Sequence, residues 1–239
     1  MPYRDQEICP FCAESGLIQK EKLDGDPIKM GALPCFCVNT QSINERFPLL
    51  YTVSDPMKED IYNIGKKYRL PSKKGVYRFK NCVFLGNEQK YLYLFKAICV
   101  GFYNYTDKFE LLDGLQVVHN YHVEQIDDSH RTIYDLIDMD LFGLTFRNKT
   151  ENKAVDKTVQ DTIQNRLRYN KGTWVFCESM NNLENDKGCN KGTLEILNSG
   201  EFSICALSDP KVFDYKGFFD AQDQRIKQAV DLNRMLGSF

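Results

Sequence analysis

Four cysteines near the amino terminus form the group of residues with the most specific chemistry in this sequence. Cys9 and Cys12 make one closely spaced pair, and Cys35 and Cys37 make a second. Thiolates bind Zn²⁺ with bonds of about 2.3 Å, and two such pairs complete a tetrahedron that leaves no position open for a substrate. The spacing therefore predicts a structural zinc ion held by these four thiolates.

The chain between the two pairs has to fold back on itself to place four thiolates on one ion. Residues 17–18 and 28–30 favour two short strands around a turn at 24–27. Over the first 40 residues the pattern resembles the zinc-ribbon class, although its second pair is Cys-x-Cys where Cys-x2-Cys is common. We expect a zinc-ribbon module at 1–45 and a single body at 46–239.

The rest of the chain indicates an α+β body with a mainly antiparallel sheet that could close into a barrel. Long apolar and aromatic stretches separated by short polar turns favour strands in a meander. The expected strands are 47–53, 76–79, 82–85, 91–95, 99–103, 115–123, 173–177, 193–197 and 201–207. Helical spacing of apolar residues predicts three to four helices, at 57–70, 129–137, 150–167 and 218–236.

Composition limits the classes of protein. A net charge of −2 and a pI of about 6.0 argue against a chain coated in basic residues for bulk nucleic-acid binding. No apolar run approaches the ~18 residues that span a bilayer, and the polar start is no signal peptide. Nine cysteines, an odd number, favour reduced thiols. We expect a soluble intracellular protein, cytoplasmic or nuclear, without membrane contact.

A local basic stretch, here called the basic segment (residues 66–80), offers a binding surface despite the acidic balance. Its cations could neutralise phosphates while its aromatic rings stack on unpaired bases, a combination that suits single strands. The alternative is that these cations bind no ligand and simply form a solvated helix end and the outward face of one strand. The residues expected to contact DNA or RNA are Lys66, Lys67, Arg69, Lys73, Lys74, Tyr77, Arg78 and Phe79.

Two carboxylates, Asp138 and Asp140, are candidate catalytic residues. If they lie on a strand, positions i and i+2 project to one side and could share a divalent metal for phosphoryl or nucleotidyl transfer. The string 136–141 resembles the hydrophobic-Asp-hydrophobic-Asp motif of polymerase-β-like nucleotidyltransferases and archaeo-eukaryotic primases. The glycine-serine turn of the former and the later Ser-x-His of the latter are missing. An acidic helix end or turn is therefore the favoured interpretation.

The three histidines, His119, His122 and His130, are further candidates. His122-Val123-Glu124 resembles the His-x-Glu of zinc deaminases, but the Pro-Cys-x2-Cys that those enzymes need downstream is absent, so a deaminase is excluded. A general acid or base role for one histidine, His122 foremost, stays open. A histidine satisfied by neighbours within a sheet is the simpler interpretation.

We therefore predict a zinc-ribbon protein that binds DNA or RNA, favours single strands and lacks catalysis. One alternative is a metal-dependent enzyme acting on nucleic acids or nucleotides through Asp138 and Asp140. Another is a structural or adaptor protein whose ribbon and terminal helix contact a protein partner or a second copy of the chain. Salt-dependent binding distinguishes the first from the other two.

Overall fold

The computed structural model describes residues 9, 12–13, 15–19, 31–70, 77–120, 132–146, 153–185 and 189–206. Their helices and strands follow in chain order: β1 (Leu17–Gln19), β2 (Ala32–Pro34), α1 (Phe36–Arg46), α2 (Pro48–Tyr51), α3 (Lys58–Tyr68), β3 (Arg69–Leu70), β4 (Arg78–Phe79), β5 (Cys82–Leu85), α4 (Glu88–Phe102), β6 (Phe109–Asp113), α5 (Gly114–Asn120), α6 (Ile133–Asp138), β7 (Leu141–Thr145), α7 (Lys153–Arg168), β8 (Gly172–Cys177), α8 (Met180–Asn185), α9 (Lys191–Leu197) and β9 (Ser203–Ala206).

The central element is an open sheet of five parallel strands in the order β6-β7-β8-β5-β9. Parallel sheets carry helices on both faces, so their strands are apolar along their whole length. The residues of β7 and β8 are all buried, and so are the first three of β5. The expected antiparallel, barrel-like sheet is therefore wrong, and the body is an α/β layered structure.

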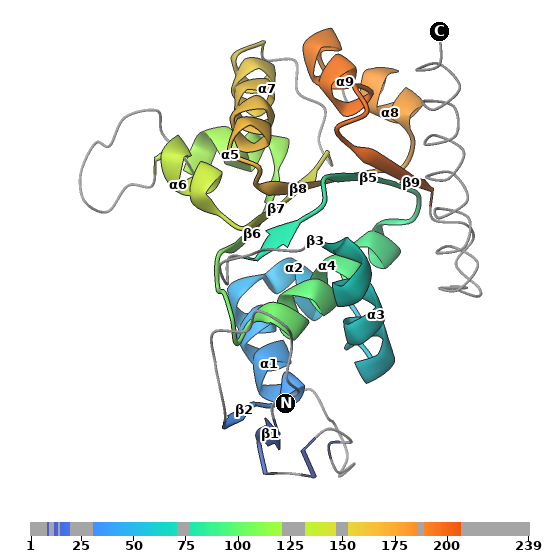
Figure 1. Cartoon of the computed structure of the whole chain (residues 1–239). Coiled ribbons are helices and arrows are strands. Elements are labelled where there is room, and N and C mark those ends of the chain that lie inside the picture. The colour runs from blue at the N-terminus through green and yellow to red at the C-terminus, as the bar shows by residue number, and fades with distance from the viewer. Residues whose placement is uncertain are drawn as a thin grey trace, which may run out of the picture.

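The strand order explains how the helices divide between two layers. From β5 the chain crosses to the far edge at β6 and then returns through β7 and β8 to β9. Because crossover connections are right-handed, travel in opposite directions puts the connecting helices on opposite faces. Helix α4 accordingly packs with α1, α2 and α3 on one face, while α5 to α9 cover the other (Figure 1).

Helix α4 shows why the sheet direction was not readable from the sequence. Its residues were expected to form two strands, 91–95 and 99–103, because they are almost continuously apolar. A helix buried on most sides gives the same composition, since it has no broad polar face. Asn87 caps this helix by accepting a hydrogen bond from the backbone N–H of Gln89 at 2.8 Å. The expected strands at 47–53 and 193–197 likewise fall on α2 and α9, and the described part of the one expected at 115–123 falls on α5. The nine helices of the described residues exceed the three to four expected.

Several expectations agree with the structure. Helix α3 buries Ile61, Ile64 and Tyr68 on one face, as their spacing predicts. Helix α7 buries Val155, Val159 and Ile163. The strands expected at 82–85 and 173–177 are β5 and β8. The expected helix at 218–236 lies outside the described residues.

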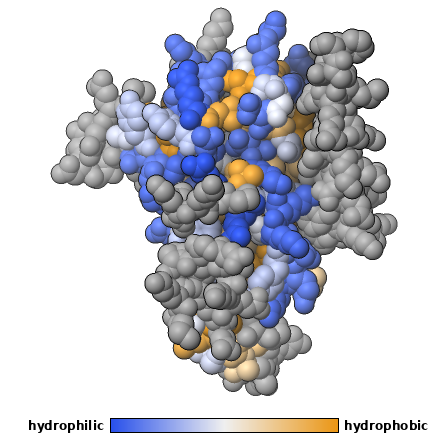
Figure 2. All heavy atoms as spheres, in the orientation of Figure 1, coloured by the Kyte–Doolittle hydropathy of each residue, from blue (hydrophilic) through white to orange (hydrophobic). Residues whose placement is uncertain are grey.

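The amino-terminal segment joins the body through helix α1. The Asn39 side chain donates to the Val100 carbonyl oxygen of α4 at 3.2 Å, and Ile43 is fully buried in the same core. The division at residue 45 stays a prediction, although α1 packs into the core of the body. On the face that Figure 2 shows, most described residues are hydrophilic and hydrophobic ones lie in small separate groups. No helix among the described residues has the length and apolar character needed to cross a membrane.

Candidate metal centre and neighbouring cavity

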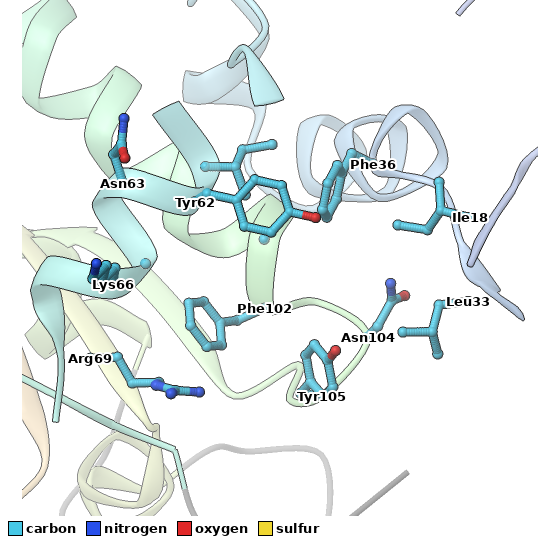
Figure 3. A pocket seen from close by; sticks show the side chains of 13 residues that line it. Ile18, Leu33, Phe36, Tyr62, Asn63, Lys66, Arg69, Phe102, Asn104 and Tyr105 are labelled. Carbon is cyan, nitrogen blue, oxygen red and sulfur yellow. The ribbon is translucent and has the colours of Figure 1, made fainter. Parts of the chain in front are cut away.

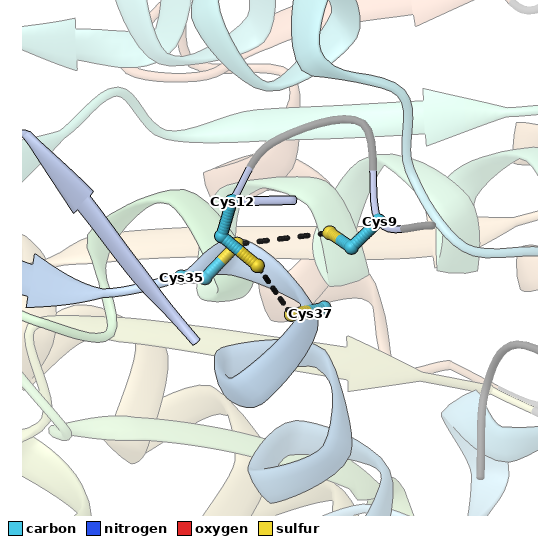
Figure 4. Close-up of side chains that lie close together, drawn as sticks. All are labelled: Cys9, Cys12, Cys35 and Cys37. Carbon is cyan, nitrogen blue, oxygen red and sulfur yellow. Dashed lines mark hydrogen bonds between the residues drawn. The ribbon is translucent and has the colours of Figure 1, made fainter. Parts of the chain in front are cut away.

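The four predicted cysteines converge on one point. Their sulfur atoms all lie within 4.8 Å of one another, and Figure 4 shows the side chains directed toward a common centre. The Sγ atoms of Cys9 and Cys35 are 3.9 Å apart, and those of Cys12 and Cys37 are 3.8 Å apart. A regular tetrahedron with metal–sulfur bonds of about 2.3 Å has sulfur–sulfur edges of about 3.8 Å. The cluster could therefore hold a metal ion.

Tight backbone turns position the first pair. The Ala13 N–H donates to the Cys9 carbonyl at 2.9 Å, and Ala13 has a positive φ of 46°. Gly16 follows with φ of 68°, a conformation that glycine adopts without steric cost. The Gly16 carbonyl then accepts a 2.8 Å hydrogen bond from the Cys35 N–H, which ties the first turn to the second cysteine pair.

The second pair sits at the start of a helix, which the zinc-ribbon expectation did not include. Strands β1 and β2 pair as an antiparallel hairpin, with Leu17 opposite Pro34. Cys35 then takes the N-cap position of α1, and Cys37 lies in its first turn. The helix start explains the unusual Cys-x-Cys spacing. It also favours thiolates, because the amino end of a helix dipole is positive. The expected strand at 28–30 lies outside the described residues.

Burial and mutual hydrogen bonding shift the pKa values of the thiols in opposite directions. Burial raises the pKa of Cys37 to about 11 and holds the pKa of Cys35 well above its ordinary value. Burial also opposes ionisation of Cys12, but hydrogen bonds with Cys35, the Gly16 backbone and the other two thiols lower its pKa to about 7. A cation bound at the centre would displace the remaining protons. All nine cysteines lie in the described residues, and none forms a disulfide.

The basic segment forms the end of one helix and a two-stranded hairpin. Lys66 and Lys67 lie in the last turn of α3, and β3 pairs with β4 so that Leu70 faces Arg78. Lys66 and Arg78 are exposed, whereas Arg69 is half-buried. Lys73 and Lys74 lie outside the described residues.

The two aromatic residues of this segment lie in the core. Phe79 is 2% exposed, and its ring contacts Phe102 with centroids 5.2 Å apart. Tyr77 is 9% exposed and contacts Phe102 and Tyr105 at 5.4 and 5.3 Å. Strand alternation is the cause, because Tyr77 and Phe79 are two residues apart and project to the buried side, whereas Arg78 between them projects to solvent. Both rings are buried and neither lines the cavity described below, so the structure gives no support to base stacking on Tyr77 or Phe79.

The cysteine cluster, the hairpin β1–β2 and the start of α1 are here called the metal module. A cavity of about 300 Å³ lies beside the basic segment, between the metal module and helices α3 and α4. Lys66 and Arg69 stand at one end of it, and Ile18 and Leu33 of the β1–β2 hairpin stand at the other (Figure 3). Aromatic side chains lie between the two ends. They come from three separate stretches of sequence, which is why spacing alone did not reveal them: Phe36, Tyr62, Phe102 and Tyr105.

Asp138 and Asp140 do not form the strand pair that metal-dependent chemistry would need. Asp138 ends α6, and Asp140 stands just before β7 at the amino edge of the sheet. Lys171 contacts the carboxylate of Asp140 at 3.1 Å and that of Asp138 at 3.5 Å. A hydrogen bond from Lys108 holds the pKa of Asp138 below its usual value. The two carboxylates are therefore balanced by lysines, and ligands of parallel sheets bind at the opposite, carboxyl edge.

The histidines contribute no described site. His119 is exposed on helix α5, whereas the sequence predicted a strand there. His122 and His130 lie outside the described residues. Among those residues, the group of three or more metal-ligating side chains close enough to share an ion is the cysteine cluster.

A second cavity, of about 480 Å³, lies at the carboxyl ends of β6 and β7. Its polar side chains make local contacts: Leu115 N–H donates to Asp113 Oδ1 at 2.9 Å, and Asp113 N–H donates to Gln116 Oε1 at 2.8 Å. Arg46 donates to the Phe109 carbonyl at 2.6 Å. Much of the polar lining of this cavity is therefore bonded to neighbouring protein atoms and serves the fold itself. Sequence reasoning missed this cavity because its position follows only from the parallel sheet.

No protein-family model matches the chain, and no curated protein matches it. Fold and site together define an α/β protein with a four-cysteine centre at its amino-terminal end.

Proposed function

We propose that this protein binds single-stranded DNA or RNA and carries a structural zinc ion on Cys9, Cys12, Cys35 and Cys37. The observation that supports binding is the meeting of cations and rings at one cavity. Lys66 and Arg69 of the basic segment line the same hollow as Tyr62 and Phe102. Cations of this kind neutralise phosphates, and aromatic rings stack on unpaired bases.

Zinc is the metal that suits the centre best. Four sulfur ligands in tetrahedral arrangement are typical of structural Zn²⁺ sites, which have no open coordination position. The cluster is largely buried, because Cys9, Cys12 and Cys35 are each at most 9% exposed. The ion would fix the hairpin β1–β2 and the start of α1 against each other.

Elemental analysis of protein purified without added metal tests the zinc assignment. One zinc per chain is expected in the unaltered protein, and Cys35→Ser should lose it. Cys189→Ser is the matched control, because Cys189 lies in the other helical layer, outside the cluster. Iron in place of zinc, or full zinc retention by Cys35→Ser, would contradict the assignment.

Titration of a labelled single-stranded oligonucleotide tests the binding. Affinity should fall steeply between about 50 and about 200 mM salt, with a slope near −0.7 per phosphate contact in a logarithmic plot. Replacing both Lys66 and Arg69 by Gln should weaken binding and reduce the slope by about 0.7 for each cation removed. The control replaces exposed Lys157 and Lys191, which carry the same charge on the opposite layer, by Gln.

These measurements separate the alternatives. Equal binding by both double variants would show that the cavity cations have no special role. The absence of any salt-sensitive binding would remove the proposed function altogether.

A further inference from the structure

The cavity beside the basic segment has the size and walls of a pocket for one flat ring system. Its volume of about 300 Å³ is at the lower limit of small-molecule sites, which span about 300–1,000 Å³. Such a space accepts a single planar heterocycle better than a whole chain segment or an extended apolar peptide.

Aromatic side chains supply the flat surfaces. Phe36 and Tyr62 contact each other edge to face, with ring centroids 6.2 Å apart. Figure 3 shows Tyr62, Phe102 and Tyr105 around the same hollow. Tyr62 is 37% exposed and Phe102 is 7% exposed, so one ring lies at the mouth and the other deeper. A heterocycle entering from solvent would meet Tyr62 first.

Polar groups stand where a nucleotide would need them. Lys66 and Arg69 lie together at one end of the cavity, whereas Asn104 lies toward the hairpin (Figure 3). The Asn104 amide nitrogen donates to the Pro34 carbonyl at 2.9 Å, which orients the amide. Its carbonyl oxygen is an acceptor of the kind that base amino and imino groups require. The cationic end complements phosphate, and the apolar end does not.

We infer that this cavity takes one unpaired nucleobase of a bound strand, with the adjoining phosphates against Lys66 and Arg69. The inference rests on the proposed nucleic-acid binding and names the part of the strand that the site recognises. Base insertion explains a preference for single strands, because a base inside a duplex is stacked and paired and would have to be extruded.

The metal module forms one wall of this pocket. Ile18 and Leu33 come from the paired strands β1 and β2, and Phe36 stands between the two cysteines of the second pair. Base insertion should therefore depend on the metal, while phosphate contacts made by Lys66 of α3 and Arg69 of β3 should depend on it much less.

The test uses two oligonucleotides of equal length, one with 2-aminopurine at its centre and one with an abasic site there. Both keep every phosphate. The unaltered protein should bind the first about 5- to 150-fold more tightly, the range that stacking of one base on aromatic side chains supports. The 2-aminopurine fluorescence should be quenched on binding.

Tyr62→Ala should remove most of that preference, because it deletes the ring at the mouth of the cavity. Tyr134→Ala is the matched control, since Tyr134 is 69% exposed on α6 and lies outside the cavity. Circular dichroism and a thermal midpoint check that both variants fold.

Each outcome is decisive. Salt-sensitive binding with equal affinity for the two oligonucleotides would overturn base insertion and leave the proposed function standing. A loss of affinity for both oligonucleotides in Tyr62→Ala would also overturn insertion. An apolar compound that copurifies in the native mass spectrum, without any effect of the base, would assign the cavity to another ligand. No binding to either oligonucleotide would remove both proposals.

Discussion

The metal module and the parallel sheet are held together by different kinds of interaction. The module has two strands of three residues each and a small buried cluster made mostly of cysteines. The sheet has five strands whose side chains fill cores on both faces, including fully buried Trp174, Phe84 and Phe142. Apolar burial and a continuous ladder of paired strands support the sheet, whereas the small described part of the module is expected to depend on a bound metal to stay folded.

This contrast has a consequence for the candidate site, which lies where the two regions meet. One wall comes from the module, and the others come from helices α3 and α4, which pack on the sheet. If the metal is removed, the cavity is thus expected to lose the wall that the module forms while the parallel sheet stays folded.

Removal of the metal should unfold the module and spare the sheet. Structural zinc contributes on the order of 10 kcal/mol to small modules, far more than the few contacts of β1 and β2 could replace. Hydrogen exchange should therefore become fast at 15–19 and 31–35 and stay slow at 172–177 after chelation. The preference for a base over an abasic site should disappear in the same sample. Equal loss of protection in both regions would show that the two form one cooperative unit.

Trp174→Ala should destabilise the sheet by about 3–5 kcal/mol, because it leaves a large cavity in the core. Trp174 is fully buried, contacts Tyr68 and Phe84, and donates from its indole nitrogen to the Lys80 carbonyl at 3.0 Å. Denaturant unfolding measures the change. Metal content should stay unchanged when the variant is folded. Tyr169→Ala, at a 66% exposed position, should change stability by no more than about 0.5 kcal/mol.

Gly101→Ala should cost about 1–3 kcal/mol, because an added methyl group overpacks the contact of α4 with α3. A Cβ at Gly101 would stand 2.6 Å from Cγ2 of Ile61, so the Ile61 side chain or one of the two helices has to shift. Both residues line the cavity, and the shift should also reduce the preference for a base. Gly114→Ala is the control, since its nearest neighbour would be 3.9 Å away. An unchanged unfolding midpoint in Gly101→Ala would mean that the helices adjust freely.

Sequence reasoning located the metal centre but not the cavity, and physics explains the difference. Metal ligands are few, chemically distinct and close in sequence, so Cys9, Cys12, Cys35 and Cys37 stand out before any fold is known. The cavity collects Ile18, Tyr62 and Tyr105 from distant elements, and each of them alone is an ordinary apolar residue.

The fold itself was only partly readable. Buried strands such as 82–85 and 173–177 were found because their apolar runs are short. Helix α4 was misread because a helix buried on most sides lacks the polar face that gives helical periodicity. Once α4 is taken for strands, the crossover from β5 to β6 disappears and a meander replaces the parallel sheet.

The smallest effect is expected at the amino edge of the sheet, where the carboxylates once suggested catalysis. Asp138→Asn should lower stability at pH 7 by no more than about 1 kcal/mol, because Asp138 is 59% exposed and exposed ion pairs contribute little. Lys108 and Lys171 lower the pKa of Asp138, so its contribution is present above the unfolded pKa of about 3.9. It is lost as the pH falls through the lower folded pKa.

Unfolding curves of both proteins from pH 7 down to about pH 2 measure this contribution, and the two should coincide at the acid end. Glu201→Gln at an exposed position controls for the loss of one negative charge. Binding of the oligonucleotides should be the same in both variants, since neither Asp138 nor Glu201 lines the cavity. A large loss of binding in Asp138→Asn alone would return the carboxylates to the functional site and place it on the sheet rather than beside the metal.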